Sequence, residues 1–291
     1  SAAHWNSSLL SMLGPADDPA TDRELLRQTR EDRTLGACWG PFSLEQLNSV
    51  WGPGGWRAIV RRGLWQPHNG KLRAIDNARS SQHNEATSEQ ERLRVICGDI
   101  VPAVARRYMS LLRDPADASL AASSSQLLQG GASTQPTYNL SSLPPQQGRA
   151  RLRRASSFSK PPFQLVGSSE DWSRGYRQRA CNEASLRFNV VAFYHADLHK
   201  VVFWVYAGLL FGLASSVISF NRTPALFVAV LRRVAGIPAF HYFDDLGVLD
   251  PEALSALGTE ALRLVHSSSG FQLDGKKTSA ASSDWVFLGV L

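Results

Sequence analysis

The chain of 291 residues is 43% hydrophobic and 19% charged, which is the composition of a globular protein with one large domain or two smaller ones. Its 31 Lys and Arg residues outnumber its 25 Asp and Glu residues, so the net charge is +6 and the pI about 9.5, a balance that suits a polyanionic partner without requiring one. Three scattered cysteines without a CxxC pair exclude a disulfide framework, argue against a zinc site and predict an intracellular protein, either cytoplasmic or nuclear.

Residues 1–35 are mostly polar and contain one helical stretch, "TDRELLRQTRED". We predict that they form a partly disordered lead-in to the folded chain. They lack the basic start and the long apolar core of a signal peptide. In the next segment Ser43 is followed by Gln46, a spacing typical of a capping box, so a short helix is expected to begin there.

The composition of the chain changes in its middle, after a predicted strand and a predicted helix. Residues 70–85 predict a short strand within a polar loop, and residues 88–114 have the apolar spacing of a helix. Residues 117–162 are rich in Ser, Ala, Gln, Gly and Pro and end in a basic cluster, so we interpret them as a low-complexity basic insertion or linker. Its arginines fit a solvated tail, contact with a phosphate backbone or a nuclear-import signal.

The last segment, residues 163–291, alternates strand-like and helical patterns, which places the chain in the α+β class. Two hairpins and a final strand are expected, over residues 188–194 with 201–206, 239–243 with 246–249, and 284–291. An amphipathic helix is expected before the final strand. Asp250 would be its N-cap, Pro251 its first residue, and Gly270 would lie just past its end.

Residues 201–220 carry no charge and are long enough to span a bilayer. The first part is β-branched and aromatic, which favours a strand instead, and Gly208 and Gly212 interrupt the stretch. A buried strand, a tight turn and the start of a buried helix explain it equally well.

Asp244 and Asp245 lie side by side in "FHYFDDLGVL", between two apolar runs. The pair is either a plain hairpin turn, where Asp is common, or a site for a cation. A cation site needs a third carboxylate, and Asp171 is the best candidate because it follows a predicted strand end. Such carboxylates can hold two divalent ions about 4 Å apart. Mg²⁺ fits because it takes carboxylates together with substrate phosphates, and Mn²⁺ is an alternative.

Six segments, in order along the chain, resemble the conserved blocks of reverse transcriptases of the retrotransposon and retroviral kind. They are "KLRAIDNARSSQHN", "DWSRGYRQ", "LLFGLASSVISFNR", "YFDD", "GFQLDGKKT" and "VFLGV". The resemblance implies a right-hand polymerase with a fingers-like region over residues 36–116 and a palm region over 163–291, in which helices back an antiparallel sheet. The last block resembles the start of the primer grip and no thumb block follows, so the chain resembles a divergent form that lacks the thumb.

The resemblance also implies an activity. The protein would add deoxynucleotides to a primer 3′-hydroxyl on an RNA or DNA template by a two-metal mechanism. Asp171, Asp244 and Asp245 would be the catalytic metal ligands, and Lys277 would be a general acid for pyrophosphate, with Lys276 as the alternative. The residues that would contact the incoming nucleotide are Lys71, Arg73, Tyr176, Phe211 and Gly212.

Four of these five nucleotide contacts have a chemical or steric reason. Lys71 and Arg73 suit a triphosphate because Lys is a point charge and Arg a planar fork of donors, although both also fit a solvated surface pair. Tyr176 lies five residues after Asp171, where the family keeps an aromatic ring that collides with a ribose 2′-hydroxyl, and the alternative is a packed core tyrosine. Gly212 would let the backbone approach the nucleotide.

The implied partners are a primer, an RNA or DNA template and dNTPs, without a membrane. Thumb and RNase H regions would be further domains of a polyprotein. Two other functions stay open. One is a catalytically inactive nucleic-acid-binding remnant of a retroelement. The other is an RNA-dependent RNA polymerase, which Tyr176 and the Tyr242–Phe243 pair disfavour because such enzymes usually have Asp and Gly at those places.

Overall fold

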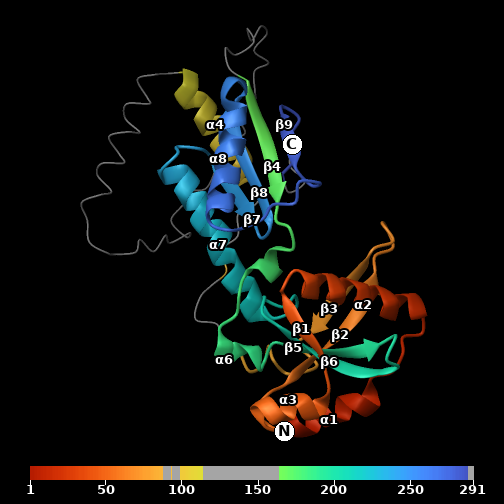
Figure 1. The fold of residues 1–291 in the computed structure, drawn as a ribbon. Coiled ribbons are helices and arrows are strands. Elements are labelled where there is room, and N and C mark those ends of the chain that lie inside the picture. Colours follow the sequence, from red (N-terminus) through yellow and green to blue (C-terminus); the bar gives the residue numbers. More distant parts are fainter. Residues whose placement is uncertain (88–92, 94–98, 114–163, 288–291) are drawn as a thin grey trace, which may run out of the picture.

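The computed structural model describes residues 1–87, 93, 99–113 and 164–287, and its strands form two sheets (Figure 1). The N-terminal sheet has five strands in the order β1-β6-β5-β2-β3, and the C-terminal sheet has four in the order β7-β8-β4-β9. Helices pack on both sheets, so the predicted α+β class is confirmed. The predicted insertion over residues 117–162 lies outside the described residues.

The N-terminal sheet combines two segments that are far apart in the sequence. Its strands are β1 (Cys38–Phe42), β2 (Ala58–Trp65), β3 (Leu72–Asn77), β5 (Val190–His195) and β6 (Lys200–Tyr206). β2 pairs with β5 in parallel, with Ala58 opposite Val190, and the other pairs are antiparallel. The predicted β5–β6 hairpin forms, but the assignment of all of 163–291 to one region is corrected, because this hairpin completes the N-terminal sheet. A parallel pair between distant segments leaves no local signal in the sequence.

Helices cover both faces of the N-terminal sheet. They are α1 (Ala2–Met12) and α3 (Leu44–Trp51) on one face and α2 (Pro19–Thr34) on the other. Leu9 and Leu26 are buried against the sheet, so the expected partly disordered lead-in over residues 1–35 is corrected. The charged outward face of α2 dominates its composition and conceals the narrow apolar stripe. The predicted capping box of Ser43 and Gln46 is present at the start of α3.

The C-terminal sheet is antiparallel and lies between helices. Its strands are β4 (Leu165–Asp171), β7 (Ala239–Tyr242), β8 (Asp245–Pro251) and β9 (Ser279–Ser282), and its helices are α4 (Ile100–Arg113), α7 (Ala214–Arg233) and α8 (Ser255–Ser268). Val248 packs with α7 and α8, whereas the next residue, Leu249, packs with α4 and Trp285 on the other face. The last strand within the described residues is β9. Of the predicted strand over 284–291, residues 288–291 lie outside the described part.

The uncharged stretch over residues 201–220 is divided as expected into a strand, a turn and the start of a helix. Within the described residues α7 is the one helix long and apolar enough to cross a membrane. Its side chains Phe220, Phe227 and Leu231 are buried in the core that α7 forms with the C-terminal sheet. Core helices of this kind meet the same length and hydropathy criteria as membrane spans.

Asp250 is placed differently from the prediction. It belongs to β8, a short 3₁₀ turn (Glu252–Leu254) follows, and α8 begins only at Ser255. The carboxyl group lies under α8, where a side chain at Gly258 would collide with its Oδ2 atom. That buried atom has no hydrogen-bond partner among the described residues. Burial raises the pKa of Asp250 to about 6, from an ordinary value of 3.8.

This buried carboxyl predicts an unusual dependence of stability on pH. Because the pKa of Asp250 is higher in the folded chain, its contribution to stability is complete below pH 3.8 and is lost as the pH rises through 6. We expect Asp250→Asn to be more stable than the wild type at pH 8, by about 2–3 kcal/mol, with the advantage vanishing toward pH 4. Urea unfolding at several pH values measures this. Asp17→Asn, at an exposed site, is the control, and a D250N curve parallel to the wild type would contradict the prediction.

Candidate active site

Three carboxylates meet at one end of the C-terminal sheet. Asp171 is the last residue of β4 and Asp245 the first residue of β8, and the two are directly opposite each other in the antiparallel pair. Asp244 lies in the turn between β7 and β8. The strand register therefore brings the three acids of the sequence prediction to one place, although they come from segments about 70 residues apart.

The β7–β8 turn is tight and strained. Tyr242 pairs with Asp245, which leaves Phe243 and Asp244 as the two turn residues. Phe243 has a φ of +53°, in the left-handed region that bulky side chains rarely adopt. A positive φ at the first turn residue alone is the pattern of a type II′ hairpin turn, where glycine is usual. Backbone strain of this kind persists where the surrounding structure holds a side chain in a required position, here Asp244.

The carboxylates destabilise each other's charge. Burial raises the pKa of Asp244, its own backbone N–H lowers it, and Asp171 raises it further. Burial and then the charges of Asp244 and Asp171 raise the pKa of Asp245. Both residues of the pair are exposed to solvent. Acids that repel each other in this way favour a bound cation, because a cation offsets the repulsion.

Lys277 supplies a cation from the chain itself. Its Nζ donates to Oδ2 of Asp171, an ion pair that raises the pKa of Lys277. The segment is held in place by its backbone, because Asp274 N–H donates to the Asp171 carbonyl at 2.8 Å and Lys277 N–H donates to the Asp274 carbonyl at 2.9 Å. The structure thus brings Lys277 to the carboxylates, and Lys276 has no such contact among the described residues.

The acids fit a divalent metal in chemical type. Oδ1 of Asp171 is buried and has no hydrogen-bond partner among the described residues, and a buried acceptor of this kind suits a metal ligand. Side-chain rearrangement would be needed, because Lys277 takes the other oxygen of Asp171. In their present positions no three His, Cys, Asp or Glu side chains of the described part form a group that could hold a metal ion.

Tyr176 is part of an aromatic group next to the acids. It lies in the 3₁₀ turn η2 (Gly175–Gln178), five residues after Asp171. Its ring stacks on Phe220 at 4.7 Å and meets Phe211 edge-on at 5.8 Å. Burial, followed by the charge of Asp244, raises the pKa of Tyr176, so the ring lies within electrostatic range of the acids. This packing holds the ring as a wall beside the carboxylates.

Gly212 packs closely against the N-terminal sheet. Its φ is +118°, and a side chain there would collide with the backbone carbonyl of Asp76 in β3. The neighbouring Phe211 carbonyl accepts a hydrogen bond from Asp76 N–H at 3.3 Å. The close approach that requires glycine is therefore to β3 of the N-terminal sheet. Phe211 itself is 46% exposed beside Tyr176, where it remains available for contact with a ligand.

The two predicted phosphate contacts, Lys71 and Arg73, lie in the N-terminal sheet. Arg73 is exposed on β3, and its charge lowers the pKa of Asp244, so the two side chains lie within electrostatic range of each other. Lys71 precedes β3 and is exposed, and the described residues show no ion pair between it and the carboxylates. Of the two, only Arg73 is tied to the acids by an interaction.

A foamy viral protease–reverse transcriptase, solved in complex with double-stranded DNA, superposes with a TM-score of 0.56 and 13% sequence identity. The match covers 94% of this chain and 34% of that chain, so this chain spans about a third of that protein's length. The fold is reverse transcriptase-like. No protein-family model matches the sequence, and no curated protein matches it significantly.

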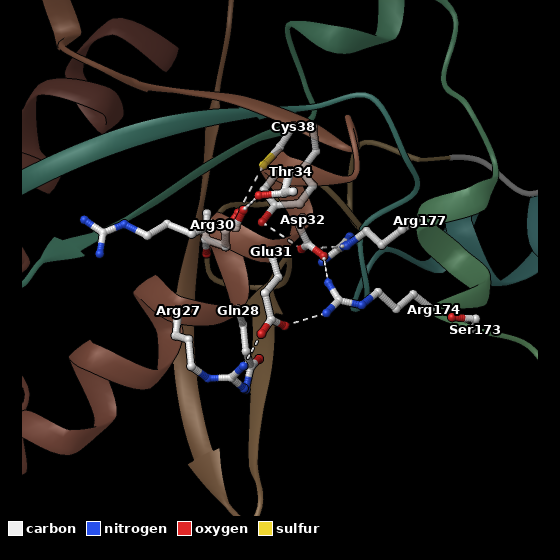
Figure 2. A network of polar contacts seen from close by, with 12 residues as sticks. Arg27, Gln28, Arg30, Glu31, Asp32, Thr34, Cys38, Ser173, Arg174 and Arg177 are labelled. Carbon is white, nitrogen blue, oxygen red and sulfur yellow. Dashed lines mark hydrogen bonds and ion pairs between the residues drawn. The ribbon is translucent and has the colours of Figure 1, made fainter. Parts of the chain in front are cut away.

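The sequence analysis did not predict a network of buried charges that joins α2, β2 and β3 to the segment after β4. Asp32 of α2 and Asp76 of β3 are buried, and Arg61, Arg174 and Arg177 bind them. Figure 2 shows Arg174 and Arg177 extending from the segment after β4 to Glu31 and Asp32. A signal was present, because Arg61 interrupts the apolar run of β2 and a charge inside a buried strand requires a buried partner.

Proposed function

We propose that the protein is a template-directed nucleotidyltransferase that adds deoxynucleotides to a primer 3′-hydroxyl on an RNA or DNA template. The observation that carries the proposal is the register of β4 and β8, which sets Asp171 opposite Asp245 beside the Asp244 turn. The fold likeness to a reverse transcriptase bound to double-stranded DNA supports the same class of activity and partner. The template, the primer and dNTPs would lie between the two sheets.

The three acids and Lys277 would have separate roles in the reaction. Asp171, Asp244 and Asp245 would hold two Mg²⁺ ions, with Mn²⁺ as the alternative. When bound, the ions would activate the primer hydroxyl and stabilise charge on the leaving pyrophosphate. Lys277 would leave Asp171 and donate a proton to the pyrophosphate.

The triphosphate would meet the N-terminal sheet, whereas its sugar would meet the aromatic group. Arg73 would hold the triphosphate with its planar fork of donors, and Lys71 would add a point charge. The sugar would lie against Tyr176 and Phe211.

Mg²⁺-dependent extension of a primer on an RNA template, with purified protein and dNTPs, tests the proposal. We expect extension that is lost in EDTA and restored by excess Mg²⁺. Binding of primer–template without any extension at high protein concentration would contradict it. That outcome would favour the inactive nucleic-acid-binding remnant, for which the Lys277–Asp171 ion pair is the specific observation.

Tyr176 predicts sugar selection. The Tyr176 ring is stacked on Phe220, which prevents it from moving away from the sugar. A ribose 2′-hydroxyl would therefore collide with the ring. We expect Tyr176→Ala to raise the relative use of ribonucleotides by roughly tenfold or more, an effect of about 1.4 kcal/mol. Single-nucleotide incorporation with dNTP and rNTP pairs measures the ratio. Tyr176→Phe keeps the ring and is the matched control, and equal ratios in Tyr176→Ala and wild type would remove the proposed role.

A further inference from the structure

We infer that Arg177 is a positioning residue that assembles the nucleotide pocket from three separate segments. The inference rests on the proposed function. Among the described residues, Arg177 forms no ion pair or hydrogen bond with Asp171, Asp244 or Asp245, so its role would be to hold other groups in place. Its side chain is 15% exposed, and its guanidinium lies against α2, β3 and β6.

The first segment is the one that carries Asp171 and Tyr176. Arg177 directly follows Tyr176 in η2, so its side chain anchors the turn that presents the aromatic ring. Its Nε lies 3.3 Å from Oδ2 of Asp32 on α2. Tyr206 O–H donates to the same oxygen at 3.2 Å, and the Arg177 guanidinium lies over the Tyr206 ring at 4.5 Å. An ion pair and a cation–π contact in the interior restrict this side chain to one position.

The second segment is the loop between β6 and α7, which carries Phe211. Nη1 of Arg177 donates to the Leu209 carbonyl at 2.6 Å. In return, Leu209 N–H donates to the Tyr176 carbonyl at 3.0 Å. A side chain at Gly208 would collide with the Arg177 backbone, so the two segments are also in direct contact. The loop and the turn are therefore joined through Arg177 on both its side chain and its backbone.

The third segment is β3, which carries Arg73. Nη2 of Arg177 lies 3.7 Å from Oδ2 of Asp76, three residues after Arg73 on the same strand. The Asp76 N–H donates to the Phe211 carbonyl, which links β3 to the loop a second time. The guanidinium thus joins the turn that carries it to the other two segments and to α2. Arginine suits this because its donors lie on three separate nitrogens in a fixed, branched geometry, whereas a lysine ammonium has all its donors on one nitrogen.

Loss of Arg177 leaves both buried acids with partners. Asp76 keeps two hydrogen bonds from Arg61, at 2.7 and 3.0 Å, and Asp32 keeps Arg174 at 2.6 Å. An unpaired buried charge is the usual reason why such a change unfolds a protein, and it does not arise here. Arg177→Gln and Arg177→Lys are therefore expected to stay folded, with a loosened pocket as the main effect.

Steady-state kinetics and hydrogen exchange test the inference. We expect Arg177→Gln to raise the KM for dNTP about tenfold and relax sugar selection, with primer–template Kd within twofold of wild type. Arg177→Lys should show the same pattern more weakly. Exchange of the Asp76 and Leu209 amides should accelerate together in Arg177→Gln. The matched control is Arg30→Gln, which removes an ion pair of 2.6 Å to Asp197 elsewhere on α2 and should change none of these quantities.

Each outcome decides the inference. An unchanged dNTP KM in an active Arg177→Gln protein overturns it, and so does exchange that accelerates equally over the whole chain. If the wild type extends no primer, the proposed function fails by itself. The inference is then decided by exchange alone: joint acceleration at Asp76 and Leu209 supports the coupling of the segments, and unchanged exchange overturns it.

Discussion

Replacing Asp244 by Asn is expected to reduce primer extension to below about one-thousandth of the wild-type rate, a loss of about 4 kcal/mol in transition-state stabilisation. Asp244 lies in the β7–β8 turn, where desolvation and Asp171 raise its pKa and where it follows the strained backbone of Phe243. Asn keeps the size of the side chain and removes the charge that a metal ion needs. Single-turnover extension with saturating dNTP measures the effect, because it separates the chemical step from binding.

The control for this change is Asp17→Asn, which removes a carboxylate at an exposed position of the N-terminal half and should extend primers normally. The thermal unfolding temperature of Asp244→Asn should match or exceed that of the wild type, because the change removes a charge that desolvation and the neighbouring Asp171 disfavour. Extension at the wild-type rate by the folded variant would exclude Asp244 from the site.

Replacing Arg61 by Met is expected to destabilise the chain by about 3–5 kcal/mol, the cost of leaving a buried charge poorly paired. Arg61 and Asp76 are both buried and share two hydrogen bonds across neighbouring strands. Burial alone lowers the pKa of Arg61, but the charge of Asp76 and the hydrogen bonds to Asp76 and Tyr206 more than offset this, so the guanidinium stays charged. Without it, the Asp76 carboxylate keeps, among the described residues, only the longer contact with Arg177. Urea unfolding gives the free energy directly.

Two further variants show whether the unpaired charge of Asp76 causes the loss of stability in Arg61→Met. Arg62→Met, one residue along the same strand, removes an exposed charge and is expected to change stability by less than about 0.5 kcal/mol. The double variant Arg61→Met with Asp76→Leu removes both charges and should recover more than half of the loss, because a buried ion pair replaced by apolar groups is often neutral. A double variant no more stable than Arg61→Met would show that lost packing, and not the orphaned charge, is responsible.

The elements with a strong local pattern could be predicted from the sequence. The two hairpins, the capping box at Ser43 and the turn at Asp244 have spacings or residue types that fix their conformation without distant contacts. The three acids were also found, because their order along the chain resembles a known family, and the register of β4 and β8 places them together. Their catalytic roles stay predictions.

What the sequence did not reveal depends on contacts between distant segments. The parallel pairing of β2 with β5 and the Arg177 network each join residues more than 100 positions apart. Asp before Pro is a strong local signal for a helix cap, so the sequence predicts one at Asp250, but the ladder between β4 and β8 extends through it to Pro251. The sequence predicts a close approach at Gly212 but does not identify Asp76 of β3 as the neighbouring group.

The parallel β2–β5 pairing has a consequence for how such a protein can be recombined. The N-terminal sheet takes three strands from residues 38–77 and two from residues 190–206, so a single crossover anywhere between them separates partners of one hydrogen-bonded ladder. A chimera with a relative's second half would insert foreign strands into the native sheet, where Ala58 must meet the residue equivalent to Val190. An exchange of the N-terminal sheet that preserves every ladder needs three crossovers, because β4 lies between β3 and β5 in the chain and must stay with its partners β8 and β9.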